Sequence, residues 1–143
     1  MKTLKNLVTG TLLVLVLLPL ACQTIPKHEG SIFTIRVRHI SDYKAYEDHR
    51  VGVNEPFYLA DTEYQAEVKR FVPDFAINLK TKEVISRSDK PLNPAVKLAV
   101  SFQNQLLYET WSLYQNPLPH AVHDPGYYFQ LINYEIPDRP VER

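Results

Sequence analysis

The chain of 143 residues contains a single cysteine, Cys22. One cysteine cannot form an intramolecular disulfide, and it cannot supply the several thiolates of a structural zinc site or a redox motif. The Cys-x-x-Cys-His signature of covalent haem attachment is also missing. We therefore expect no disulfide, no thiolate chemistry and no thiolate metal site.

The chain also lacks an excess of charge of either sign, with 16 basic and 16 acidic residues. Nucleic-acid binding requires clustered lysine and arginine that neutralise phosphates, so we expect no nucleic-acid partner. The same balance leaves no polybasic segment for attachment to anionic lipids.

Motifs of the common hydrolases and nucleotide-binding proteins are missing as well. The sequence has no Gly-x-Ser-x-Gly elbow, no His-Glu-x-x-His and no glycine-rich phosphate loop, and it contains only four glycines. It therefore predicts a protein that is not an enzyme and carries no cofactor.

The one long apolar run lies near the amino terminus and follows Lys2 and Lys5. Positive residues followed by such a run are typical of a secretory signal peptide. The fully apolar core is about ten residues, whereas a helix needs roughly twenty to cross a bilayer. Residues 1–21 are therefore interpreted as a signal peptide rather than as a permanent membrane helix.

The signal ends at residues 18–22, Leu-Pro-Leu-Ala-Cys, which resemble the lipobox of bacterial lipoproteins. Ala21 and Cys22 match that pattern, whereas Pro19 stands where the family usually has leucine. The resemblance implies cleavage before Cys22, a diacylglycerol on its sulfur and an acyl group on the new amino terminus. It predicts a lipid anchor on the extracytoplasmic face of the bacterial envelope. In that family a non-acidic residue such as Gln23 favours the outer membrane. The alternative is an ordinary secreted protein in which Cys22 is incidental.

The rest of the chain is long enough for one domain. Residues 22–30 are interpreted as a lipidated tether, in which residues 24–30 have no periodicity and reach roughly 25 Å when extended. Residues 31–137 form the predicted β-domain, and residues 138–143 are a polar tail.

Alternation of apolar and polar residues predicts short β-strands throughout this domain. The segment from residue 41 to residue 50 could instead form one or two helical turns, with Ser41 as the helix cap. The sequence therefore predicts an all-β fold, an antiparallel sandwich or open barrel of six or seven strands with at most one short helix. The expected strands cover residues 31–40, 57–71, 75–80, 84–87, 95–102, 106–115 and 127–136.

Two groups of residues are candidates for a binding site. His120, His123 and Asp124 lie close together in a proline-rich loop, and imidazole and carboxylate are suitable ligands for zinc or copper. They would make the chain a periplasmic metal- or haem-binding carrier. The alternative is that these histidines cap turns or pack on Tyr127 and Tyr128.

The second group is aromatic and lies in the last two predicted strands. A strand buries only one face against the core, so rings should appear on both faces, and an exposed set would form a partner interface. The alternative is that the rings fill the core or the sheet edges. The candidates are Tyr108, Trp111, Tyr114, Tyr127 and Tyr128.

Several short segments between residues 55 and 134 carry a family resemblance. They are residues 56–59 (Pro-Phe-Tyr-Leu), 68–75 (Val-Lys-Arg-Phe-Val-Pro-Asp-Phe), 86–89 (Ser-Arg-Ser-Asp), 93–96 (Asn-Pro-Ala-Val), Trp111 and 127–129 (Tyr-Tyr-Phe). Together these segments resemble the extracytoplasmic β-domain of ResB-type cytochrome c biogenesis proteins. No functional residue carries over, because the haem-handling histidines of that family have no counterpart here. The resemblance implies a stand-alone domain that supports membrane-bound redox assembly. Our leading hypothesis is thus a lipoprotein whose β-domain binds an envelope protein partner, in cytochrome or other envelope complex assembly.

Overall fold

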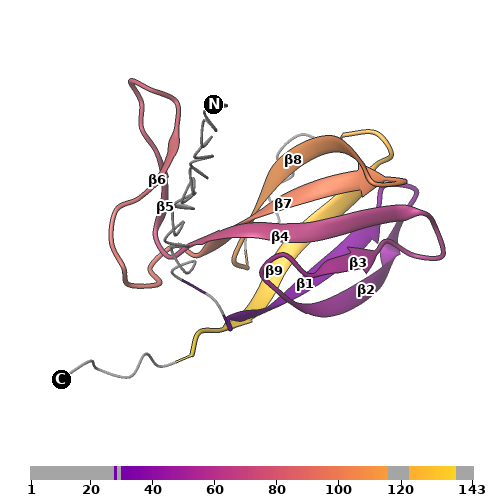
Figure 1. Ribbon diagram of the computed structural model, residues 1–143, viewed down its shortest axis with the longest axis horizontal. Helices are drawn as coiled ribbons and strands as arrows, with labels where there is room; N and C mark the ends of the chain where they lie inside the picture. The colour runs from indigo at the N-terminus through magenta and orange to yellow at the C-terminus, as the bar shows by residue number, and fades with distance from the viewer. Residues whose placement is uncertain (1–27, 29, 116–122, 138–143) are drawn as a thin grey trace, which may run out of the picture.

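The computed structural model describes His28, residues 30–115 and residues 123–137 (Figure 1). This part of the chain is all-β, with nine strands in three antiparallel sheets. The predicted fold class is therefore confirmed. The strands are β1 (Ile32–His39), β2 (Asp42–Gly52), β3 (Pro56–Tyr58), β4 (Tyr64–Val72), β5 (Phe75–Ile77), β6 (Val84–Ser86), β7 (Ala95–Phe102), β8 (Gln105–Leu113) and β9 (Tyr127–Glu135).

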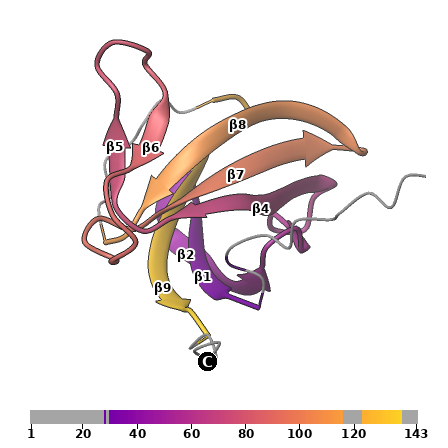
Figure 2. The same cartoon turned by 60° about the vertical axis from the view of Figure 1, so that its left-hand side comes forward.

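Two curved sheets face each other, one in the order β2-β1-β9 and the other in the order β3-β4-β7-β8 (Figure 2). They also meet at both edges. At one edge the amide of Gln115 donates to the carbonyl of Leu131 at 3.0 Å. At the other, the amide of Asn54 donates to the carbonyl of Val68 at 2.8 Å. The result is a sandwich that approaches an open barrel. The third sheet, the β5–β6 hairpin, projects from one end (Figure 1).

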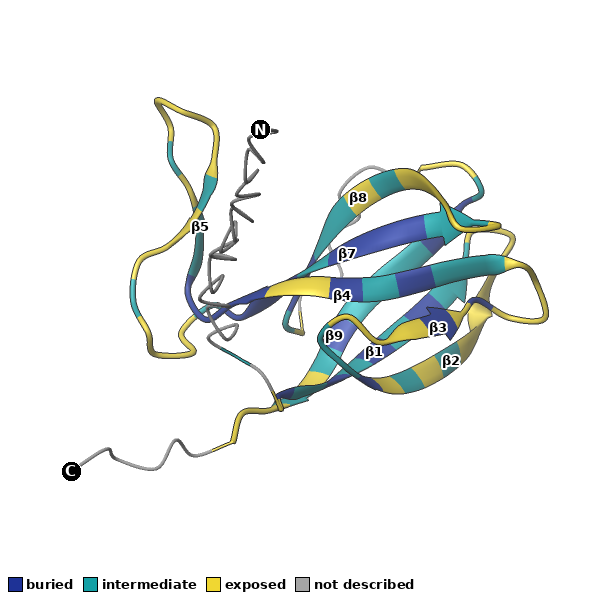
Figure 3. Ribbon diagram, viewed as in Figure 1, coloured by how far each residue is buried: buried dark blue, intermediate teal, exposed yellow. Residues whose placement is uncertain are grey.

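The core lies between the two large sheets and is built from alternate residues of their strands. Phe33 and Ile35 of β1 are completely buried, as are Val68 of β4 and Leu98 and Val100 of β7. The intervening residues are more exposed (Figure 3). The period-two pattern therefore assigned the inner face of these strands correctly.

The strand count exceeds the predicted six or seven for two reasons. One is that the predicted long strand over residues 57–71 is two strands, β3 and β4. The chain turns between them, where Ala60 has a φ of 51° and the Thr62 hydroxyl donates to the Leu59 carbonyl at 2.5 Å. The chain therefore reverses direction near Asp61, and β3 pairs with β4 as an antiparallel hairpin.

The other reason is that the segment expected to begin a short helix at Ser41 is strand β2, so that expectation was wrong. Asp42 Oδ1 does accept hydrogen bonds from the amides of Lys44 and Ala45, at 3.0 and 3.2 Å. These bonds resemble a helix cap, but here they satisfy amides where the pairing of β1 with β2 shifts register. Pairing with β1 overrides the local preference for a helix.

The remaining predicted strands are confirmed, and four of them pair as two hairpins. Strands β5 and β6 pair across an exposed turn, and β7 and β8 pair across Gln103 and Asn104. Both of these turn residues have positive φ, 48° and 65°, which is the conformation of a type I′ turn.

Candidate functional site

Two predicted site residues, the lipid attachment residue Cys22 and the ligand His120, lie outside the described residues. Among the residues that are described, no helix is long and apolar enough to cross a membrane. The lipid anchor and the histidine pair therefore stay predictions.

The other two predicted ligands, His123 and Asp124, lie in the turn before β9. The His123 ring packs on Tyr108 at 4.6 Å between centroids, so one histidine does contact a tyrosine, though on β8 rather than β9. No group of three metal-ligating side chains occurs within the described ranges. Both residues, together with Tyr108, line a cavity of about 390 Å³ at this end of the barrel.

The hydroxyl of Tyr108 is buried beside this cavity and has no hydrogen-bond partner among the residues that the structure describes. Burial raises the pKa of Tyr108 to about 12, with smaller contributions from Tyr127 and Asp124. A buried hydroxyl without a partner lowers stability, because it has lost its hydrogen bonds to water.

Replacing Tyr108 by phenylalanine is therefore expected to raise the free energy of unfolding by about 1 kcal/mol at neutral pH. The folded pKa of about 12 lies above the ordinary value of 10.0, so the folded protein holds this proton more tightly than the unfolded chain does. The stabilisation of the wild type that comes from this tighter proton binding is fully present below pH 10, and it is lost as the pH rises towards 12. Urea unfolding across this alkaline range should show a shallower loss of stability for Tyr108→Phe than for the wild type. Tyr58→Phe, at an exposed tyrosine of β3, is the control. Equal alkaline slopes for both variants would contradict the prediction.

The five predicted aromatic residues do not form one patch. Tyr127 is buried, and Tyr108 and Tyr114 pack against the core. Trp111 packs on Phe75 with ring centroids 5.3 Å apart. Only Tyr128 lies on the outer face of the sheet β2-β1-β9, where it pairs with Arg38 of β1.

That outer face carries a cluster of side chains that could not be grouped from the sequence. We call it the tyrosine–arginine face, and it consists of Arg36, Arg38, Tyr43, Tyr46 and Tyr128. Tyr43 and Tyr46 of β2 are 57% and 56% exposed. The Tyr43 and Tyr128 rings lie 5.2 Å apart, and their hydroxyls share a hydrogen bond of 2.5 Å.

The two arginines hold Tyr46 in place. The guanidinium carbon of Arg36 lies 3.9 Å from the centre of the Tyr46 ring and that of Arg38 lies 5.4 Å from it, which is cation–π geometry. Arg36 also donates two hydrogen bonds of 2.7 Å to the carboxylate of Asp48. These bonds lower the pKa of Asp48. The face is therefore ordered before any partner binds.

The charge of Arg38 is not neutralised in the same way. Its guanidinium donates to the amide oxygen of Gln130 at 3.3 Å, and no carboxylate in the described part of the chain forms an ion pair with it. The cluster thus offers one cation beside exposed aromatic rings.

The sequence contained a partial signal for this face. Arg36 and Arg38 fall on the polar side of the first predicted strand, but Tyr43 and Tyr46 belong to the segment interpreted as a helix.

Comparison with protein-family models, with curated proteins and with solved structures finds no match to this chain.

Proposed function

We propose that this protein is a lipid-anchored lipoprotein of the bacterial cell envelope, and that its β-domain is non-catalytic and binds a protein partner. The observation that carries the proposal is the tyrosine–arginine face, with two tyrosines more than half exposed on the outer face of the sheet β2-β1-β9. Tyrosine and arginine are enriched among the residues that dominate protein interfaces.

The contacts within the face support this role. Side chains that are already ordered lose little conformational entropy on binding. The Tyr46 ring contacts the guanidinium groups of Arg36 and Arg38, and the Tyr43 hydroxyl is hydrogen-bonded to that of Tyr128. We infer that the partner places an apolar group on these rings and a carboxylate on Arg38. The resemblance to ResB-type domains suggests cytochrome or other envelope complex assembly as the setting.

The interface can be tested by site-specific photo-crosslinking in cells that express the protein at its native level. A photoreactive residue at position 46 should yield a defined adduct, and the same residue at position 58 should not. Tyr58 is the matched control because it is also a tyrosine, 59% exposed, on β3 of the other sheet. With the purified partner, Tyr46→Ala should weaken binding by about 30-fold or more, the range of an interface hot spot. Equal crosslinking at the two positions would contradict the proposal.

The anchor is tested separately by mass spectrometry of the mature protein. We expect an amino terminus at Cys22 that carries a diacylglycerol and an additional acyl chain. Because each buried methylene contributes about 0.8 kcal/mol, such an anchor would hold the protein on the membrane almost permanently. An unmodified amino terminus or an intact signal peptide would contradict this part of the proposal.

A further inference from the structure

The β5–β6 hairpin and its connection to β7, residues 75–93, form an arm that stands away from the two large sheets (Figures 1 and 2). Four aliphatic side chains of this arm are exposed: Ile77, Leu79, Ile85 and Leu92, with Leu79 81% exposed near the tip. Ile85 pairs with Ala76 and Ile77 with Val84, so Ile77 and Ile85 point to opposite faces of the hairpin. An arm that is apolar on both faces is suited to insertion into an apolar phase rather than to packing on one side.

Basic residues flank these aliphatic side chains. The arm contains four basic residues, Lys80, Lys82, Arg87 and Lys90, and two acidic residues, Glu83 and Asp89. Arg87 pairs with Asp74 at the root, whereas the three lysines form no ion pair with any residue that the structure describes. The balanced charge of the whole chain therefore conceals a local excess of positive charge around exposed leucine and isoleucine.

The root of the arm is held firmly. The Phe75 amide donates to the Asn93 carbonyl at 2.8 Å, and the Asn93 side chain donates to the Phe75 carbonyl at 2.9 Å. A buried carboxylate, that of Asp74, accepts a hydrogen bond of 2.6 Å from Arg87. The arm is thus presented in one orientation.

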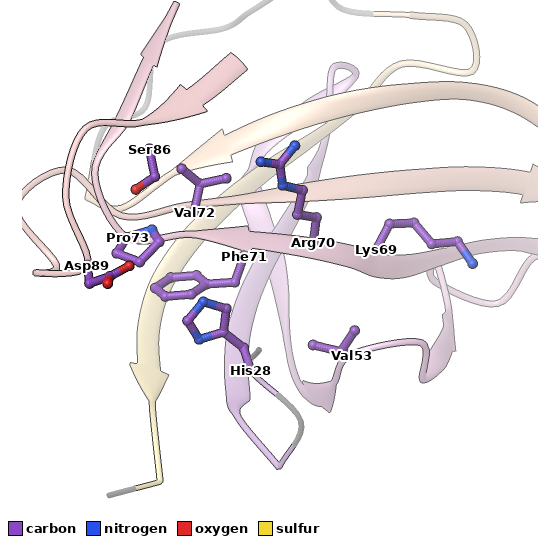
Figure 4. A pocket seen from close by; sticks show the side chains of 9 residues that line it. All are labelled: His28, Val53, Lys69, Arg70, Phe71, Val72, Pro73, Ser86 and Asp89. Atoms are coloured by element: carbon purple, nitrogen blue, oxygen red, sulfur yellow. The ribbon is translucent and has the colours of Figure 1, made fainter. Parts of the chain in front are cut away.

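The arm lies close to His28, near the point where the predicted tether joins the domain. His28 and two arm residues, Ser86 and Asp89, line the same cavity of about 370 Å³, with Phe71 and Pro73 between them (Figure 4). The six residues that lead from Cys22 to His28 can span about 20 Å at most. A lipid on Cys22 would therefore keep the arm close to the lipid headgroups.

We propose that the β5–β6 arm inserts its tip into the interfacial region of an anionic phospholipid bilayer, with its lysines on the phosphates, and so orients the domain on the membrane. Aliphatic side chains flanked by lysine match the apolar and anionic layers of such a surface. The inference rests on the anchor proposed above, which brings the arm to the membrane.

The test uses the lipidated full-length protein with an environment-sensitive fluorophore on Leu79→Cys, reconstituted in vesicles of phosphatidylethanolamine and phosphatidylglycerol. We expect the emission to shift to the blue and to be quenched by brominated lipids. The matched control is the same label on Leu106→Cys, at an exposed leucine of β8. Leu106 follows the β7–β8 turn, which lies at the opposite end of the domain from the arm (Figures 1 and 2). That label should stay in water.

A second pair of variants tests the role of charge. Lys80→Glu combined with Lys90→Glu should abolish the shift at position 79, whereas Lys44→Glu on β2 should leave it unchanged. If the protein sediments with the vesicles but the label at position 79 stays in water, the arm proposal is overturned and the anchor stands. A label that is shielded only in native envelopes would likewise overturn it, in favour of a protein covering the arm. Failure to sediment would overturn the anchor and the inference together.

Discussion

Replacing Phe33 by alanine is expected to lower the free energy of unfolding by about 3–5 kcal/mol, the usual range for a large aromatic ring in a core. Phe33 is completely buried and its ring lies 5.3 Å from that of Phe71 on the opposite sheet. Alanine would remove the ring from the contact between the two sheets and leave a cavity that the flanking strands fill only in part. For a domain of this size the melting temperature should fall by roughly 15 °C.

Thr34→Ala is the matched control for this substitution. Thr34 is the next residue of β1 and lies on the outer face, paired with Arg50 and Asn133, so its replacement should cost less than about 1 kcal/mol. Urea unfolding of the three proteins, followed by the fluorescence of Trp111, measures both effects. If the two variants lost similar amounts of stability, the assignment of the inner face of β1 would be refuted.

The inner faces of the long strands could be predicted because a strand that is buried on one face alternates apolar and polar residues. In β1 the side chains of Phe33, Ile35 and Val37 alternate with polar neighbours, and all three are buried. The pattern needs no knowledge of what the strand pairs with, because one buried face is enough to produce it. The gap between the strands expected over residues 95–102 and 106–115 likewise placed a turn at residues 103–105, where Gln103 and Asn104 connect β7 to β8.

Strand β2 could not be predicted from its own residues. Its first half is almost entirely exposed, so no buried face imposes alternation on Tyr43, Lys44, Ala45 and Tyr46. Pairing with β1 decides that this segment is a strand, and the register shift between Val37 and His39 decides which side its tyrosines face. Neither property can be inferred from the segment alone.

The tyrosine–arginine face could not be predicted from the sequence for the same reason. Tyr43 and Tyr128 are 85 residues apart in the chain and become neighbours only because β2 and β9 pair with the two edges of β1. A sequence can mark each tyrosine as a candidate, but the grouping depends on the sheet order. The grouping of side chains at this surface therefore depends on topology, whereas the core depends on the pattern within each strand.

Gly126, just before β9, is the position where a single methyl group should cost most. It has a φ of 95°, a conformation that side chains rarely adopt, and a Cβ there would lie 2.7 Å from Cγ2 of Ile40. Its carbonyl accepts a hydrogen bond of 2.9 Å from the Ile40 amide. Beside it, Nε2 of His39 lies 2.9 Å from the carbonyl of Pro125 and must donate, because a carbonyl only accepts. These bonds attach the turn of His123 and Asp124 to the end of β1.

Gly126→Ala is therefore expected to lower the free energy of unfolding by about 2–3 kcal/mol, the sum of backbone strain and a steric clash. Gly52→Ala is the matched control: its Cβ would meet nothing closer than 3.4 Å, and the change should stay within about 1 kcal/mol. Combining Gly126→Ala with Ile40→Ala separates the two causes, since the smaller side chain relieves the clash but not the strain. The double variant should therefore lose less stability than the sum of the two single variants. If Gly126→Ala proved as stable as Gly52→Ala, the close approach of this turn to β1 would be refuted, and with it the positions of His123 and Asp124 beside Tyr108.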